Sequence, residues 1–111
     1  MYEQGEILIV PFPFSDLRSV KRRPVLVLSK KRDNEISDDI ITCGITSNLK
    51  DSKYSVLIEN KNLARGQIPV KSRIKVNKLF TIDKRIVEKS IGAIDKETFD
   101  KVKMEFHNLL K

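Results

Sequence analysis

The sequence predicts a small, mainly β protein: a strongly curved antiparallel sheet or barrel of five or six short strands, with one C-terminal helix packed on it. Short β-branched runs recur as far as Ala93. The connections between them are short, which favours antiparallel pairing of consecutive strands. After Asp95 the apolar pattern changes to three- and four-residue steps, as on a helix. The 111 residues leave room for one core, so we expect one domain over residues 1–111, with short helical turns in its loops.

The first two strands are marked by apolar runs beside prolines. Residues 7–10 predict a strand of about five residues that ends at a bend, because Pro11 and Pro13 interrupt the run. Pro24 opens the next run, and residues 25–28 are apolar on both faces, as in a central strand. Residues 15–22, between these runs, have the composition of a polar loop.

Three further strands are predicted, at residues 40–46, 55–58 and 72–79. Period-two alternation sorts the first of them into two faces: Ile41, Cys43 and Ile45 on one, Thr42, Gly44 and Thr46 on the other. Residues 72–79 alternate as well, with Ile74 and Val76 against Arg73, Lys75 and Asn77. Residues 61–69 read as a loop because they include Gly66 and Pro69.

The C-terminal part ends in an amphipathic helix. Asp83 is placed to cap a single helical turn, and residues 91–93 form a short closing strand. Asp95 is the expected N-cap of the helix. The apolar stripe of this helix consists of Phe99, Val102, Phe106, Leu109 and Leu110. We interpret its two phenylalanines as core anchors rather than a base-stacking platform, Met104 as lying off the stripe, and His107 at its border as structural.

Composition excludes several classes of function. A single cysteine, Cys43, and a single histidine allow neither a disulfide framework nor a zinc site. Gly-rich phosphate loops and Cys/His nucleophile pairs are absent from the sequence, so we expect neither metal nor cofactor. The apolar runs are too short for a membrane span, and no signal-like stretch is visible, so we expect a cytoplasmic protein without membrane contact.

The net charge of +7 favours a polyanionic partner, above all nucleic acid. Residues 18–32 contain seven basic residues and no acidic one, and residues 61–78 contain six and none. Two solvated loops balanced by acids elsewhere would give the same pattern. Charge alone identifies no substrate and implies no catalysis.

Three motifs in register resemble the MazF/PemK-like toxin family. The first combines Gly-Glu-Ile at residues 5–7, Val-Pro-Phe-Pro-Phe-Ser-Asp-Leu at 10–17 and Lys-Arg-Arg-Pro-Val-Leu-Val-Leu-Ser at 21–29. The second is Ile-Thr-Ser at residues 45–47. The third is Asn-Lys-Leu-Phe-Thr-Ile-Asp at residues 77–83, followed by Ile91-Gly92. Their order and spacing extend over nearly the whole chain.

The resemblance implies a compact SH3-like barrel, usually a homodimer, that cleaves single-stranded RNA at short sequences without a metal ion. It implies attack of a ribose 2′-OH on the adjacent phosphate, which leaves a 2′,3′-cyclic phosphate and a 5′-OH. It also implies a cognate antitoxin whose acidic, partly disordered segment covers the RNA site.

The resemblance assigns catalytic roles to Arg23 and Thr46. A guanidinium can give two parallel hydrogen bonds to phosphate oxygens and stays charged at any relevant pH. Pro24 biases Arg23 toward an extended backbone. Without the motif, Arg23 would read as one more exposed basic residue and Thr46 as a residue that simply fits a strand. The remaining candidate RNA contacts are Asp16, Arg18, Lys21, Arg22, Ser47, Asn48, Lys75, Asn77 and Lys78.

The general base is not identified by the sequence. Many family members carry a carboxylate where this chain has Asn77, and an amide cannot accept a proton near neutral pH. Asp16 is the nearest carboxylate in the matching loop, and that loop has no histidine. Alternatively, catalysis has no dedicated base and rests mainly on positioning and on charge stabilisation by Arg23.

Two other functions remain open. A catalytically inactive nucleic-acid-binding barrel would bind RNA or DNA in a salt-sensitive manner without products. Alternatively, the basic face serves mainly to bind an acidic protein partner.

Overall fold

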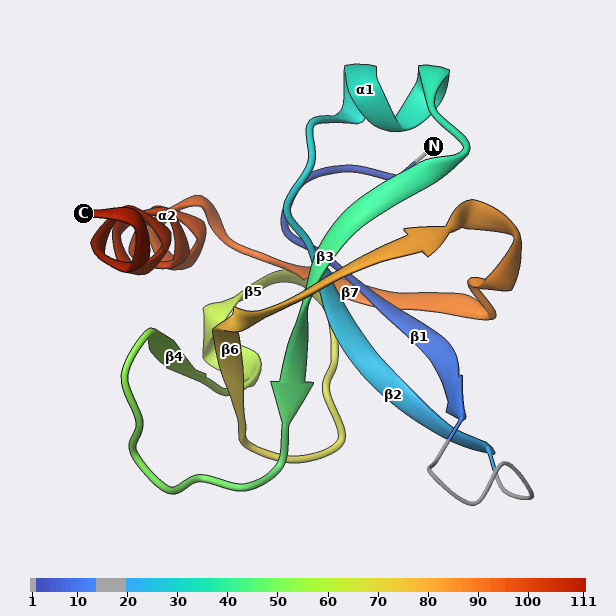
Figure 1. Cartoon of the computed structure of the whole chain (residues 1–111). Coiled ribbons are helices and arrows are strands. Elements are labelled where there is room, and N and C mark those ends of the chain that lie inside the picture. Colours follow the sequence, from blue (N-terminus) through green and yellow to red (C-terminus); the bar gives the residue numbers. More distant parts are fainter. Residues whose placement is uncertain (1, 14–19) are drawn as a thin grey trace.

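Seven strands form one antiparallel sheet in the part of the chain that the structure describes. The structure is a computed structural model and describes residues 2–13 and 20–111. The strands are β1 (Glu6–Pro13), β2 (Val20–Val27), β3 (Asp39–Thr46), β4 (Ser55–Ile58), β5 (Leu63–Gly66), β6 (Ser72–Asp83) and β7 (Lys89–Ile94). They lie in the order β4-β6-β3-β2-β1-β7-β5 and curl around each other, as Figure 1 shows. The predicted fold class, a curved antiparallel sheet with one long C-terminal helix, is confirmed, with seven strands instead of five or six.

The first hairpin is longer than the sequence predicts. β1 pairs with β2 from Ile7 to Pro13, so residues 20–22 are strand and not loop. On its other side β1 pairs with β7 only as far as Ile9. Pro11 therefore lies where β1 is an edge on that side, and an edge tolerates a residue without an N–H.

β5 lies within residues 61–69, where a loop was predicted. It pairs with β7, and Gly66 faces Gly92 there. Gly66 has a φ of +75°, and a Cβ on it would come within 2.1 Å of the Ile91 carbonyl oxygen. The glycine that indicated a loop is thus the residue that allows the two strands to approach.

A short helix, α1 (Lys31–Ile36), was not predicted. It has no side-chain cap at its N-terminus, and the buried side chain of Asn34 holds it in place. The Asn34 Nδ2 donates to the Tyr2 carbonyl at 3.0 Å and to the Ser29 carbonyl at 2.9 Å. The hydrogen bonds of Asn34 to backbone groups outside the helix therefore stabilise α1 in place of a local capping residue.

The long helix, α2 (Lys96–Leu110), begins as predicted. The Asp95 carboxylate accepts the Thr98 N–H at 2.8 Å, and Asp83 caps a 3-10 turn, η2 (Lys84–Ile86), in the same way through Arg85. Met104 is off the stripe and exposed, and His107 lies exposed beside a groove between α2 and the sheet. No helix in residues 2–13 and 20–111 is long and apolar enough to cross a membrane.

Two apolar clusters lie on opposite faces of the curled sheet. The helix-side core lies under α2 and is formed by Ile7, Leu26, Cys43, Ile45, Val56, Ile58, Ile68, Ile74, Val76, Ile94 and Val102, with Phe99 and Phe106 packed against it. The second core consists of Leu8, Val10, Val25, Val27, Ile40 and Ile82, with Tyr2, Phe12 and Val87 beside it. β2 contributes to both clusters, as predicted for a central strand.

β6 carries an irregularity that changes which residues share a face. β3 pairs with β6 up to Cys43↔Leu79, and the next pair is Gly44↔Lys75, so three residues of β6 are inserted. Phe80 and Lys75 therefore point to the same face of the sheet, although simple alternation would separate them.

Candidate functional site

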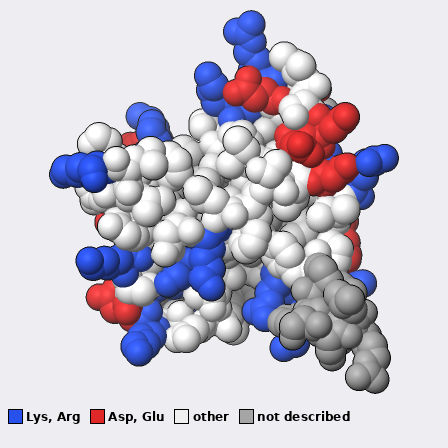
Figure 2. Space-filling model, viewed as in Figure 1, with Lys and Arg blue, Asp and Glu red and all other residues white. Residues whose placement is uncertain are grey.

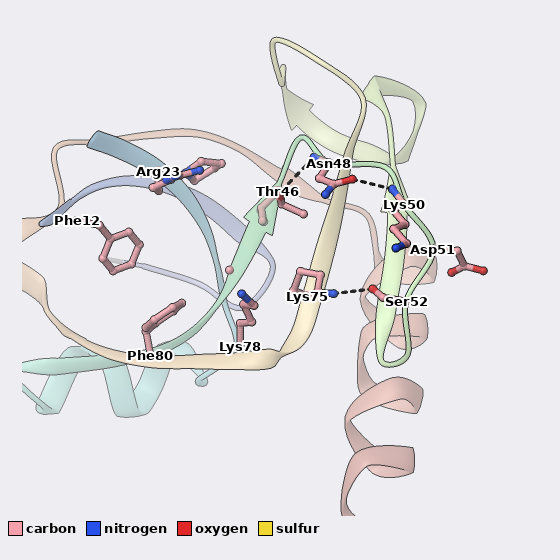
Figure 3. A pocket seen from close by; sticks show the side chains of 13 residues that line it. Phe12, Arg23, Thr46, Asn48, Lys50, Asp51, Ser52, Lys75, Lys78 and Phe80 are labelled. Atoms are coloured by element: carbon pink, nitrogen blue, oxygen red, sulfur yellow. Dashed lines mark hydrogen bonds between the residues drawn. The ribbon is translucent and has the colours of Figure 1, made fainter. Parts of the chain in front are cut away.

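A cavity of about 530 Å³ opens on the face of the second core, where the pairing of β2 with β3 ends. Its wall is drawn from β1, β2, β3, β6 and the loop between β3 and β4 (Figure 3). The lining residues are Phe12, Arg23, Pro24, Gly44, Ile45, Thr46, Asn48, Lys50, Asp51, Ser52, Lys75, Lys78 and Phe80. Residues that are distant in the sequence thus meet at one place.

Pro24 ends the pairing of β2 with β3 and so opens the cavity. The ladder between these strands stops at Val25↔Gly44. The Leu28 N–H donates to the Ile41 carbonyl of β3 at 2.9 Å, so even-numbered residues of β2 direct their backbone groups toward β3. Pro24 has this orientation and no N–H to donate, so the ladder cannot continue past it.

Arg23 and Thr46 face each other across this opening. Continuing the β2–β3 register by two residues brings them opposite one another, and both line the cavity. The Thr46 Oγ1 accepts the N–H of Asn48 at 3.1 Å. Its own proton is therefore directed to another acceptor. The alternation predicted for β3 holds: Ile41, Cys43 and Ile45 share the helix side, and Thr46 lies on the opposite face.

The insertion in β6 brings two lysines to the cavity. Lys75 is the cross-strand partner of Gly44, and its Nζ donates to the Ser52 Oγ at 2.5 Å. Lys78 lies three residues further along, and its Cβ is 3.7 Å from where a Cβ on Gly44 would stand. Gly44, without a side chain, leaves the space between Arg23 and these lysines open.

Two phenylalanines form the apolar part of the wall. The rings of Phe12 and Phe80 have centroids 4.9 Å apart and planes tilted by 46°. Both lie inside the first and third sequence motifs, but the sequence alone did not single them out. An aromatic pair that lines a cavity beside cationic side chains can stack on a nucleobase while the cations contact phosphate.

The loop between β3 and β4 forms the far wall; the sequence analysis selected Ser47 and Asn48 in it, and of these two only Asn48 lines the cavity. The Asn48 Oδ1 accepts the Lys50 N–H at 3.0 Å, as in an Asx turn. Asp51 lies on the outer side of this loop, turned away from Arg23 (Figure 3). Turn composition was the available signal here, and it does not reveal which way the loop faces.

The other predicted RNA contacts lie outside the cavity lining or outside the described residues. Lys21 is the cross-strand partner of Phe12 and so lies on the cavity face, whereas Arg22 points to the other face and pairs with Glu88 at 2.6 Å. Ser47 and Asn77 are exposed and do not line the cavity, and Asn77 lies in the β6 insertion. Asp16 and Arg18 lie outside the described residues.

The cavity is electropositive. Within residues 2–13 and 20–111, its lining has four cationic side chains, Arg23, Lys50, Lys75 and Lys78, and one carboxylate, Asp51. In Figure 2 basic side chains flank the lower part of the view, below the centre, whereas acidic ones gather near α1. Fixed cations, a hydroxyl donor and an aromatic pair can bind a phosphate and its neighbouring base. Fold and site together define a small curled β protein with an electropositive pocket.

Comparison with protein families identifies this class. A model of the family described as PemK-like, MazF-like toxin of type II toxin–antitoxin system matches residues 3–110. The chain therefore belongs to this toxin family, which confirms the resemblance found in the sequence motifs. A search among curated protein sequences finds no match.

Solved structures share the fold at low sequence identity. A mycobacterial endoribonuclease in complex with its cognate antitoxin superposes with a TM-score of 0.82 at 14% identity, over 99% of this chain and 95% of that one. The MazE–MazF complex (form III) of Deinococcus radiodurans gives 0.81 at 19%, over 98% and 95%. The Mycobacterium tuberculosis toxin MazF-mt6 gives 0.73 at 16%, over 93% and 95%.

Proposed function

We propose that this protein is a sequence-selective endoribonuclease that cleaves single-stranded RNA without a metal ion, as the toxin of a type II toxin–antitoxin system. The proposal rests on one observation: Arg23 and Thr46 meet in an electropositive cavity with Lys75 and Lys78. The family supports the toxin role, and two of the similar solved structures are described as endoribonucleases.

In the proposed reaction a ribose 2′-oxygen bonds to phosphorus while the bond to the 5′-oxygen breaks. The 2′-hydroxyl loses its proton and the leaving 5′-oxygen gains one, so the products are a 2′,3′-cyclic phosphate and a 5′-OH. The phosphorane between them carries extra negative charge. Arg23 stabilises the phosphorane through two parallel hydrogen bonds, and the Thr46 hydroxyl donates a hydrogen bond to a phosphate oxygen.

The strand of RNA on both sides of this phosphate is bound by further side chains of the chain. We propose Lys75, Lys78 and Lys21 as contacts to neighbouring phosphates, and Asn48 as a contact to a base edge. We also propose contacts with RNA for Asp16, Arg18, Arg22, Ser47 and Asn77.

Among the described residues, the cavity lining offers no evident general base. Asp51 is the one carboxylate among these lining residues, and it turns away from Arg23 (Figure 3). Asn77 cannot take a proton near neutral pH. We therefore propose that charge stabilisation and positioning by Arg23 and Thr46 carry most of the rate, with Asp16 as the remaining candidate base.

We propose three further properties on the family resemblance. An acidic segment of a cognate antitoxin covers the electropositive cavity, as charge complementarity favours. The chain is a single domain that forms a homodimer, and exposed apolar side chains at Ile41 and Leu79, beside α2, support a self-association surface. The protein acts in the cytoplasm.

Cleavage of end-labelled RNA in excess EDTA tests the proposal. The wild type is expected to cut at defined sites and leave cyclic phosphate ends, and Arg23→Ala is expected to lose cutting by at least about 100-fold. Arg85→Ala is the matched control, because it removes an exposed arginine and its Asp83 ion pair far from the cavity.

Three results contradict the proposal. These are strict dependence on a divalent ion, unchanged cutting by Arg23→Ala, and salt-sensitive RNA binding without products on long incubation. The last result supports the inactive nucleic-acid-binding barrel.

A further inference from the structure

Arg73 lies beside the proposed catalytic threonine, yet it does not line the cavity. It stands on β6 as the cross-strand partner of Thr46 on β3 and of Leu57 on β4. Cross-strand partners share a face, so the side chain of Arg73 points to the cavity side of the sheet. Its side chain is only 12% exposed, because the loop between β3 and β4 covers it.

The guanidinium of Arg73 binds that loop at three places. Its Nη1 donates to the Ser55 Oγ at 3.1 Å and to the Asp51 Oδ1 at 3.4 Å. Its Nη2 donates to the Leu49 carbonyl at 3.3 Å. Leu49 and Asp51 lie within the loop and Ser55 is the first residue of β4, so one side chain binds the loop along most of its length.

The same loop is held from the cavity side by Thr46 and Lys75. The Asn48 N–H donates to the Thr46 Oγ1, and the Lys75 Nζ donates to the Ser52 Oγ. The loop is therefore held by Arg73 on one side and by Thr46 and Lys75 on the cavity side. The side of the loop that carries Asn48, Lys50 and Ser52 lines the cavity.

Stability alone does not account for this arginine. Its Nε is buried and has no hydrogen-bond partner within the described residues, which costs free energy. An apolar side chain would avoid that cost at this position. Arg73 also draws the Asp51 carboxylate toward itself and so offsets the negative charge that Asp51 brings to the cavity lining.

We propose that Arg73 is a positioning residue that holds the loop of residues 47–54 as the wall that selects the RNA base next to the cleaved phosphate. The inference rests on the proposed endoribonuclease function. The recognising groups are the amide of Asn48, the ammonium of Lys50 and the hydroxyl of Ser52, which can read the edge of an unstacked base. Arg73 touches no RNA itself and acts through these groups.

Two readouts test this role, with Arg73→Met and Arg73→Lys compared with Arg85→Met as the matched control. In Arg73→Met the amide hydrogens of Asn48 and Lys50 are expected to exchange at least about tenfold faster, while those of β3 do not change. With short RNA substrates KM is expected to rise by about tenfold and kcat to stay within about threefold, with relaxed preference for the base beside the cut.

Arg73→Lys keeps the charge and one hydrogen bond, so it is expected to restore part of the preference. It also serves as the folded variant if Arg73→Met does not fold. A fall in kcat with unchanged KM and unchanged base preference, or unchanged amide exchange of the loop, would overturn the inference alone. If the wild type does not cut RNA, the proposed function fails, and base selection by the wall fails with it.

Discussion

Replacing Pro24 with alanine tests whether a missing backbone donor keeps the cavity open. Pro24 has its backbone directed toward β3, where the ladder stops at Val25↔Gly44. Pro24→Ala supplies an N–H that can bind the Ile45 carbonyl. The ladder would then extend by one step toward Arg23 and Thr46 and narrow the opening between them.

The size of the effect follows from the new bond. A backbone hydrogen bond contributes a net ~0.5–1.5 kcal/mol, so a contribution of about 1 kcal/mol makes the closed arrangement about fivefold more populated. We therefore expect kcat/KM for RNA to fall, by up to about fivefold. Loss of the proline gives entropy back to the unfolded chain, about 0.4–1 kcal/mol, which offsets the new bond. The free energy of unfolding should change little.

The assay combines RNA cleavage with hydrogen exchange of the new backbone amide that Pro24→Ala introduces. Protection of this amide together with a loss of cleavage of up to about fivefold supports the reasoning. An amide that exchanges as fast as solvent-exposed ones, or full activity with a protected amide, refutes it. Pro69→Ala is the control, since Pro69 is an exposed proline outside the cavity lining.

Three further predictions concern stability and reactivity. Asn34→Ala removes two backbone-directed hydrogen bonds and one with the Ser29 hydroxyl, so chemical denaturation should show a loss of about 3 kcal/mol, and a loss below about 1 kcal/mol would contradict the assigned role. Burial raises the pKa of the Cys43 thiol to about 12 from 9.0. A thiol reagent should therefore label Cys43 only on unfolding, and the free energy of unfolding should fall as the pH rises from about 9 toward 12. Rapid labelling of the native protein would oppose this. Hydrogen bonds from Arg85 lower the pKa of Asp83 to about 2. The contribution of Asp83 to the free energy of unfolding is therefore complete above about pH 4 and is lost as the pH falls toward 2. Asp83→Asn should flatten that part of an acid-unfolding curve.

Elements with their own periodicity could be predicted from the sequence. The alternation of β3 correctly separates Ile41, Cys43 and Ile45 from Thr46, and α2 begins at its Asp95 cap as predicted. The stripe of α2 agrees with the structure except at its end, where Leu110 is exposed. α1 and β5 could not be predicted, because they depend on partners distant in sequence. Asn34 holds α1 through Tyr2 and Ser29, and β5 exists because Gly92 on β7 leaves room for Gly66.

The centre of the candidate site could be predicted only through the motifs. Arg23 and Thr46 have no local signal, and their meeting depends on the β2–β3 register. Lys50 and Ser52 of the far wall were missed, because the course of the loop depends on contacts with Arg73, which the sequence analysis placed only in a basic segment and on the strand face of Lys75 and Asn77. Asn77 was expected beside Lys75 by alternation, and the β6 insertion moves Lys78 there instead.

The insertion in β6 makes the chain sensitive to the parity of a single segment. Three unpaired residues separate Lys75 from Leu79 in the register, and three is an odd number. Removing or adding one residue there would move every side chain on one side of the insertion to the opposite face of the sheet. Either the lysine end or the Phe80–Ile82 end would then face the wrong side. Homologous chains that keep this pocket should therefore vary in length at this point by two residues or not at all.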